Sequence, residues 1–452
     1  MAEQLVRNQE LVGSIQEALE SNQLLELRGL LADLHPSEIA DVLESLPNEI
    51  RGELWVHIDS DIEGDVLADA SVAVRNSLVE NMDASEVADA TSGLESDDVA
   101  DILQDLPDDL ADEVLLSMDE QNRRRVTEVL TYPPDTAAGL MNLDTVTVRA
   151  DVNVDVVLRY MRRLGDLETN VDQLFVVDRR GIYQGVLPLT RLVIADPDQN
   201  IADIMVADAF PVPAATEARE VSLLFEQRDL ISAPVVDEHN HLLGRIMIDD
   251  VVDYIREENE RTILSSAGLD EDHDIFAPVL VTARQRSLWL AVNLATAFLA
   301  AWVIGLFEAT IEQLVALAVL MPVVASMGGI AGSQTLTIVV RGLALGQVGE
   351  ANSRTVLVRE IGVGFLNGCL WATVVAVIAG AWFANMQLGL VIAAAMIINL
   401  FTAGLAGAAI PLYLKRFGID PALAGGVVLT TVTDVVGFFA FLGLAAHFLV
   451  AA

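Results

Sequence analysis

The sequence predicts a multidomain membrane protein made of an all-α helical-repeat N domain, an α/β domain pair and a five-helix transmembrane domain. The first observation is that 53% of its 452 residues are hydrophobic, although its formal net charge is −40. The second is that residues 1–279 hold 19 basic and 60 acidic side chains, a net charge of −41, whereas the rest hold 7 and 6, a net charge of +1. An intensely acidic soluble half therefore precedes a nearly neutral apolar half. The third is that the acidic half contains two kinds of internal repeat.

Residues 1–135 are predicted to form the acidic helical-repeat domain. The segment Pro36–Pro47 (PSEIADVLESLP) recurs as Ser96–Pro107 (SDDVADILQDLP), with a shorter copy at residues 85–89. A candidate N-cap, apolar residues at helical spacing and a final proline are typical of short amphipathic helices stacked in an array. Asp97 and Asp101 lie four residues apart, on one helix face, where like charges repel without a counter-ion. This face is either an ordinary solvated surface or a cation site.

Residues 136–254 contain the second repeat, because Phe175–Val193 aligns with Pro234–Val252 at a constant offset. Each copy has Val-Val-Asp, a turn, a glycine, a second apolar strand and a helix that opens at Thr or Asp, which predicts a strand–turn–strand–helix unit. The pattern resembles tandem cystathionine-β-synthase-type (CBS) domains at Met141–Ala195 and Met205–Tyr254. That resemblance implies a regulatory pair that senses nucleotides or ions, with an adenine nucleotide as a candidate ligand.

Residues 255–285 are predicted to form a connecting (plug) helix and linker, and residues 286–452 a five-span pore domain in the lipid bilayer. Apolar stretches long enough to cross about 30 Å of hydrocarbon occur at Ser287–Phe307, Gln313–Val340, Val358–Phe383, Leu388–Leu414 and Ala422–Val450. Of the seven basic residues of this half, six precede span 1 or lie between spans 2 and 3 or spans 4 and 5, and Arg359 is the second residue of span 3, at the same end as the loop between spans 2 and 3. The positive-inside rule then places the N-terminal half in the cytosol and the C-terminus outside the cytoplasmic (inner) membrane.

Asp434 is the candidate pore residue, because it is the one fully charged side chain of span 5. A carboxylate at the centre of a span costs roughly 2.5–3.5 kcal/mol on insertion scales, so we expect it to face a water-filled path or a cation. The alternative is a protonated or Thr-paired structural Asp. Thr430 and Thr431 lie one turn away, and oxygen ligands suit hard cations.

Span 2 is expected to be interrupted by Pro322 and a cluster of glycines. Such a cluster is tolerated at membrane depth where backbone lines a cavity, or where helices pack closely. The alternative to a cavity is helix packing alone. The residues predicted to line the pore are Gly328, Gly329, Ser333, Gln334, Thr430 and Thr431.

The order of these parts, with GGIAGSQ in span 2 and TVTDVVG in span 5, resembles the MgtE family of magnesium channels. The resemblance implies a homodimer with a pore between the two transmembrane domains, in which Asp434 binds a hydrated Mg²⁺. It also implies closure when cytosolic Mg²⁺ bridges acidic residues. The matching metal-binding candidates are Asp97, Asp101, Asp250, Asp253 and Glu258. This chain departs from the family in Ile330 and Ser333 of span 2 and in Ala424-Gly-Gly at the start of span 5.

Electrostatics gives an independent reason to expect regulation by a divalent cation. The excess negative charge of the soluble half should drive its parts apart unless cations screen it, and a ligand that binds the compact state better shifts the population toward it. The alternatives are a coupled carrier for other divalent cations (Co²⁺, Mn²⁺) and a nucleotide-sensing membrane receptor without transport. The sequence has no nucleophile–base set or Walker motif, so no enzyme is predicted, and its acidity argues against nucleic acid as a partner.

Overall fold

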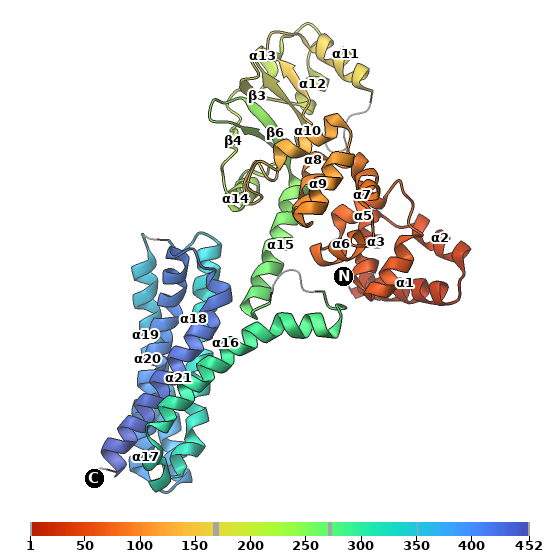
Figure 1. The fold of residues 1–452 in the computed structure, drawn as a ribbon. Helices are drawn as coiled ribbons and strands as arrows, with labels where there is room; N and C mark the ends of the chain where they lie inside the picture. Colours follow the sequence, from red (N-terminus) through yellow and green to blue (C-terminus); the bar gives the residue numbers. More distant parts are fainter. Residues whose placement is uncertain (1, 166–170, 270–273, 350, 451–452) are drawn as a thin grey trace. The chain divides into compact units, whose positions relative to one another are not determined.

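The computed structural model describes residues 2–165, 171–269, 274–349 and 351–450, which form two compact units (Figure 1). The first unit comprises residues 1–260 together with 272–277, and the second comprises residues 261–271 together with 278–452. The boundary falls inside the long helix α15 (Ile248–Ser266). The chain therefore leaves the first unit along α15, returns to it for a few residues, and then enters the membrane helices.

Short helices build the N-terminal part of the first unit around one apolar core. They are α1 (Ala2–Glu20), α2 (Leu24–Ala32), α3 (Pro36–Glu44), α4 (Asn48–Trp55), α5 (Glu63–Asp69), α6 (Val72–Val79), α7 (Ala84–Ala90), the 3₁₀ turn η1 (Thr91–Gly93), α8 (Ser96–Gln104), α9 (Asp108–Ser117) and α10 (Glu120–Val129). The two copies of the sequence repeat are α3 and α8, which bury equivalent apolar residues such as Leu43 and Leu103. The predicted helical-repeat domain is confirmed.

Two small three-stranded sheets follow, each with the same topology. Their strands are β1 (Thr147–Arg149), β2 (Gln173–Val177), β3 (Tyr183–Pro188), β4 (Val212–Pro213), β5 (Ser232–Val236) and β6 (Leu242–Met247). In each sheet the first strand is parallel to the second, which pairs antiparallel with the third. The flanking helices are α11 (Val154–Leu164), α12 (Leu189–Ile194), α13 (Ile201–Ile204) and α14 (Ala218–Arg228). The tandem α/β prediction is therefore confirmed.

The hairpin turns of the two sheets are built alike and face each other. The carboxylate of Asp178 accepts hydrogen bonds from the amides of Arg180 and Ile182, at 2.7 and 2.9 Å. Asp237 does the same for the amides of His239 and His241, both at 2.8 Å. An isolated bridge then joins Ile182 to His241. The two domains therefore pair about a local pseudo-two-fold axis.

Among its described residues, the second unit contains five helices long and apolar enough to cross a membrane. Its helices are α16 (Val279–Gly305), the short α17 (Glu308–Gln313), α18 (Ala316–Ala344), α19 (Ser353–Trp382), α20 (Met386–Arg416) and α21 (Pro421–Ala445), which continues as a π-helical turn (Ala446–Val450). Helix α20 is the central element, because it packs against α18, α19 and α21. At Gly364 and Gly404 the backbones of α19 and α20 approach too closely to admit a Cβ atom, as small residues allow between membrane helices.

The expected interruption of span 2 is wrong, because α18 is one continuous helix through Pro322 and the glycines. Proline removes one donor and crowds a preceding carbonyl, but membrane helices tolerate it where neighbouring groups satisfy the freed backbone. The glycines of this stretch can be absorbed by close packing instead of by a break, and Gly328 and Gly332 are both buried against neighbouring helices.

Candidate functional site

The carboxylate of Asp434 lies in the middle of α21, where it is partly exposed on the surface of the protomer. Within the described residues, no hydrogen bond or ion pair reaches its oxygens. The neighbouring hydroxyls are used locally: Thr430 donates to the carbonyl of Gly426 at 3.1 Å, and Thr431 donates to that of Val427 at 2.7 Å. Their lone pairs remain available beside the carboxylate. An anionic group without a protein partner at membrane depth is suited to a cation or its hydration shell.

The polar residues of α18 fall into two groups. Ser333 and Gln334 are exposed in the protomer, and Gly329 has open space where a Cβ atom would stand. Gly328, by contrast, is buried against the side chain of Asn399. Within one protomer Gly328 therefore serves helix packing, the alternative to a pore-lining role. Gly329, Ser333 and Gln334 remain available to line a path.

Asn399 on α20 is a site residue that the sequence analysis missed. Its side chain is fully buried, and its Nδ2 donates to the main-chain carbonyl of Val324 on α18 at 2.8 Å. A Cβ atom at Gly328 would lie 2.2 Å from this nitrogen, and one at Gly437 would lie 2.8 Å from it. The amide therefore joins α20 to α18 and to α21, one turn beyond Asp434. In the sequence, the signal that could have identified this residue is a single Asn within the apolar run of span 4.

A buried carboxylate, Glu360 on α19, was also missed. It is 5% exposed, and its Oε2 accepts a hydrogen bond of 3.3 Å from the hydroxyl of Thr335 on α18. Acidic groups buried in membrane helices are expensive and face the bundle interior. Asn399 thus contacts α18 at the first glycine of the cluster, and Glu360 contacts it just after the last.

A second acidic site forms in the first unit, where α8 meets the start of α15. Asp97 is 4% exposed, and neither of its carboxylate oxygens has a hydrogen-bond partner among the described residues. Burial raises the pKa of Asp97 well above its usual value, and the nearby Asp250 raises it further. Asp250 accepts a hydrogen bond of 3.0 Å from the amide of Met247, yet burial and then the charge of Asp249 also raise its pKa well above the usual value. The structure therefore brings together two of the predicted metal ligands.

Other acids of α8 share this environment. Burial, then the charge of Glu95, raises the pKa of Asp98 to about 6. Burial raises the pKa of Asp101 to about 7, although the guanidinium of Arg75 acts in the opposite direction. These carboxyl groups therefore resist being ionised together unless a cation joins them.

Along α15, the next acids differ in their surroundings. Asp253 has a side chain that is 57% exposed and lies 3.7 Å from Arg256; burial and the charge of Asp249 raise its pKa, and Arg256 lowers it. Burial raises the pKa of Glu257 while Arg75 lowers it, and Glu257 in turn raises the pKa of Asp101. Glu257 thus belongs to the cluster. Its neighbour Glu258, named from the motif, stays a prediction.

These residues define what is called here the acidic junction: Glu95, Asp97, Asp98, Asp101, Asp249, Asp250, Asp253 and Glu257. Across the described part of the chain, no three His, Cys, Asp or Glu side chains converge on one point in a way that could hold a bare metal ion. Magnesium commonly keeps several waters and is held by one or two carboxylates. The junction therefore fits a hydrated ion better than a fully dehydrated one.

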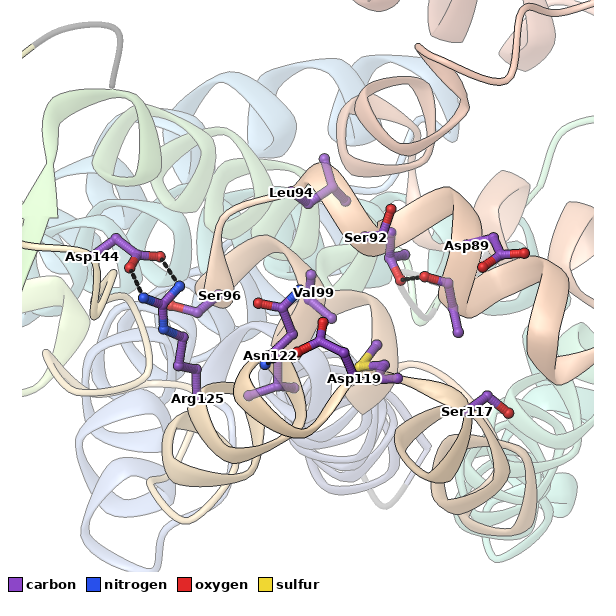
Figure 2. Close-up of a pocket in the computed structure, with 14 residues that line it drawn as sticks. Asp89, Ser92, Leu94, Ser96, Val99, Ser117, Asp119, Asn122, Arg125 and Asp144 are labelled. Atoms are coloured by element: carbon purple, nitrogen blue, oxygen red, sulfur yellow. Dashed lines mark hydrogen bonds and ion pairs between the residues drawn. The ribbon is translucent and has the colours of Figure 1, made fainter. Parts of the chain in front are cut away.

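A polar pocket of about 380 Å³ lies in the helical domain near this junction (Figure 2). At one end, Arg125 forms an ion pair with Asp144, with 2.8 Å between Nη2 and Oδ1. The hydroxyl of Ser96 accepts a hydrogen bond of 3.2 Å from the amide of Leu143. Arg125 is therefore already neutralised by Asp144. The pocket lies where the helical domain meets the segment that leads into the first CBS domain.

Comparison with known families finds matches for four segments of the chain. Residues 321–444 match the family described as MgtE, divalent cation transporter. Residues 34–135 match the MgtE intracellular N domain, and residues 137–198 and 201–257 match the CBS domain.

Individual relatives cover nearly the whole chain. It is 31% identical over 455 residues to the magnesium transporter MgtE of Thermus thermophilus, and 25% identical over 440 residues to that of Bacillus subtilis, each match covering 97% of this chain and 98% of the relative. Among solved structures, the cytosolic domain of the Mg²⁺ channel MgtE in complex with ATP is 31% identical, with a TM-score of 0.50, covering 54% of this chain and 99% of that one.

Proposed function

Because the chain belongs to the MgtE family of divalent-cation transporters, we propose that it imports Mg²⁺ across the cytoplasmic membrane along a path that passes Asp434. The observation that carries the proposal is the carboxylate of Asp434, partly exposed on a membrane helix and without a partner among the described residues. Magnesium loses its water reluctantly. The free carboxylate oxygens can accept hydrogen bonds from the first water shell, so the ion can pass hydrated.

The path requires two protomers. One chain offers a single such carboxylate, too little to surround a hydrated ion, whereas a two-fold dimer offers two. In support, Ser333, Gln334 and Thr430 are exposed in the single protomer, so a second copy can cover the faces of α18 and α21 that carry them. Mass measurement in mild detergent should give a dimer, and active particles that are only monomers would contradict this arrangement.

The acidic junction is proposed as the Mg²⁺ sensor that closes the path. Asp97 and Asp250 oppose each other in a buried setting, and a cation between them would offset both their desolvation and their repulsion. Mg²⁺ would then bind the compact arrangement better than a separated one, which is the condition for a population shift. Low cytosolic Mg²⁺ would favour separation and conduction.

The proposed orientation places the soluble half and the basic ends of the membrane helices in the cytosol. Arg341 lies at the end of α18, Arg354 at the start of α19 and Lys415 at the end of α20, which is the distribution that the positive-inside rule describes for cytoplasmic loops. With five spans, the C-terminus would lie outside.

The proposed activity is transport without covalent chemistry, so the protein is not proposed as an enzyme. A coupled carrier of Co²⁺ or Mn²⁺ is the alternative within transport. The side chains one turn before Asp434, Thr430 and Thr431, carry oxygen donors, and oxygen sites suit Mg²⁺ and Mn²⁺ while softer ligands favour later transition metals. This donor set supports Mg²⁺ over Co²⁺, and the parallel flux measurements decide between Mg²⁺ and Mn²⁺.

A second proposed ligand is an adenine nucleotide at the CBS pair. A cavity of about 330 Å³ there is lined by Tyr132, Pro133 and Val236 and bordered by Asp237 and Glu238. Its apolar walls suit a purine ring, while the two acids would favour phosphates that arrive with a divalent cation. The similar cytosolic domain was solved in complex with ATP. Titration with ATP, with and without Mg²⁺, tests this site.

The test of the proposed function is Mg²⁺ flux into liposomes that contain the purified full chain. Flux is measured while Mg²⁺ on the cytosolic side is varied, with Mn²⁺ and Co²⁺ in parallel experiments. We expect Mg²⁺ entry that falls as cytosolic Mg²⁺ rises. A protein that binds nucleotide but carries none of the three ions would favour the receptor alternative and contradict transport.

A further inference from the structure

The helical domain contains an arginine whose carboxylate partner follows α15 in the sequence. Arg51 on α4 is fully buried, and its Nε donates to the carbonyl of Leu43 at 2.7 Å. Its two terminal nitrogens hold both oxygens of Asp274, at 2.5 and 2.9 Å. Asp274 is 223 residues further along the chain, in the linker between α15 and α16. Such a bidentate, charge-assisted contact is geometrically specific.

A second arginine of the helical domain has the same arrangement, but its carboxylate partner lies within the domain. Arg75 on α6 donates from Nε to the carbonyl of Leu67 at 3.0 Å, and this leucine, like Leu43 for Arg51, lies eight residues earlier. The carboxylate that Arg75 binds, at 2.8 Å, belongs to Asp105 of the same domain. For Arg51 the corresponding carboxylate comes from the linker. The linker thus docks where a residue of the helical array would otherwise stand.

The neighbours of Asp274 strengthen this docking. Its side chain is only 12% exposed, and its Oδ1 also accepts a hydrogen bond of 2.8 Å from the amide of Phe276. The ring of Phe276 lies 6.0 Å from the guanidinium carbon of Arg51, within cation–π range. Residues 274–277 accordingly pack with the first unit, although the helix that follows them belongs to the second.

We propose that the face of α4 around Arg51 is a docking surface for the linker segment Asp274–Phe276, and that this dock couples the helical domain to the first membrane helix. Only Ala277 and Pro278 separate Phe276 from the start of α16 at Val279. A movement of the helical domain therefore either carries the linker and α16 with it or breaks the contact between Arg51 and Asp274. Breaking it leaves a buried arginine without its counter-ion, which is strongly unfavourable.

This coupling rests on the proposed function, because it supplies a second connection between the acidic junction and the pore, beside α15. When Mg²⁺ holds the helical domain at the junction, the dock also restrains α16. When the domain separates, α16 is released or displaced with it. The Mg²⁺ concentration that closes the path should therefore depend on the dock, although the dock itself binds no metal.

Hydrogen exchange on the full-length protein in lipid nanodiscs tests the docking. In the parent protein with Mg²⁺, the peptide covering residues 274–280 should be protected, since Phe276 donates its amide to Asp274. In Asp274→Asn the exchange rate of this peptide should rise about tenfold or more, because a hydrogen bond to a charged group typically contributes that much to protection. Asp105→Asn, which breaks the equivalent pair of Arg75, should loosen α6 and leave the linker peptide unchanged.

Phe276→Ala is a second variant for the case in which Asp274→Asn folds poorly, because it removes the ring without stranding Arg51. It should also speed exchange in the linker peptide. A linker peptide that is unprotected in the parent, or equally protected in the parent and both linker variants, would overturn the docking.

Flux in liposomes tests the coupling. The Mg²⁺ concentration that halves flux should rise several-fold in Asp274→Asn, while Asp155→Asn, which removes one carboxylate of an exposed pair with Arg159, should match the parent. Altered exchange together with an unchanged inhibition curve would overturn the coupling. A parent without Mg²⁺ flux would instead contradict the proposed function, and the exchange result would still decide the docking.

Discussion

The side-chain amide of Asn399 on α20 occupies the notch that Gly328 leaves on α18, while it donates a 2.8 Å hydrogen bond to the carbonyl of Val324. The same amide contacts Gly437 of α21, three residues after Asp434. One polar group thus sets the spacing of three helices. Because polar contacts between membrane helices contribute modestly, the steric fit matters as much as the hydrogen bond.

Gly328→Ala should destabilise the membrane unit, because its new Cβ atom would lie 2.2 Å from Nδ2 of Asn399. Overpacking of this kind typically costs about 1–3 kcal/mol. Thermal unfolding in detergent should show a lower Tm, and the double variant Gly328→Ala/Asn399→Ala should recover part of the loss. Gly329→Ala is the matched control, since nothing lies within 4 Å of its Cβ position. Equal Tm values for the two single variants would refute this packing.

Neutralising the acidic junction should leave conduction intact but weaken its inhibition. In Asp97→Asn/Asp101→Asn/Asp250→Asn, much of the preference of Mg²⁺ for the compact arrangement is removed, so the half-inhibiting concentration should rise about tenfold or more. Flux in liposomes measures the curve, and Mg²⁺-dependent protection of the soluble half from protease should be lost with it.

The matched control for this variant removes three exposed acids of the same unit by Asp112→Asn/Asp196→Asn/Asp198→Asn. It changes the net charge equally and should behave like the parent. If the two triple variants shift the inhibition curve by the same amount, general charge and not the junction is responsible.

The stabilising effect of Mg²⁺ should depend on pH. Burial raises the pKa of Asp98 to about 6 and that of Asp101 to about 7, against a usual value of 3.8. Between the usual pKa of 3.8 and these raised values, the folded state binds more protons than the unfolded state. Without Mg²⁺, the free energy of unfolding therefore decreases as pH rises from about 4 to about 7. Added Mg²⁺ should raise the Tm of the full-length protein more at about pH 8 than at about pH 5. An equal rise at both would count against ionised junction acids as its ligands.

The sequence was sufficient for the order of domains because the relevant signals are local and periodic. Span-length apolar runs predict the membrane helices, and the Val-Val-Asp repeat at Asp178 and Asp237 predicts the two hairpins whose turns these carboxylates close. Helix ends were less predictable. Helix α16 begins at Val279, before Arg284 and Arg286, because a helix can continue past the apolar segment that defines its span.

Contacts that join distant segments could not be predicted. The pair of Arg51 and Asp274 spans 223 residues, and neither residue lies in a motif that announces the other. In the same way, the family resemblance drew attention to Glu258, while packing puts Glu257 beside Asp101. Which of two adjacent acids turns toward α8 depends on the rotation of the helix, which the sequence pattern alone does not determine.

The most direct test of the central claim is Mg²⁺ flux through Asp434→Asn in liposomes, compared with Asp420→Asn. The first removes the charge at nearly constant volume. The second makes the same change at the N-cap of the same helix, where Asp420 accepts a hydrogen bond of 2.8 Å from the amide of Ala422, and an Asn caps equally well. We predict that Asp434→Asn lowers flux about tenfold or more, as loss of a cation's countercharge in a low-dielectric path implies, while Asp420→Asn conducts like the parent. Undiminished flux in a folded Asp434→Asn protein would contradict the account.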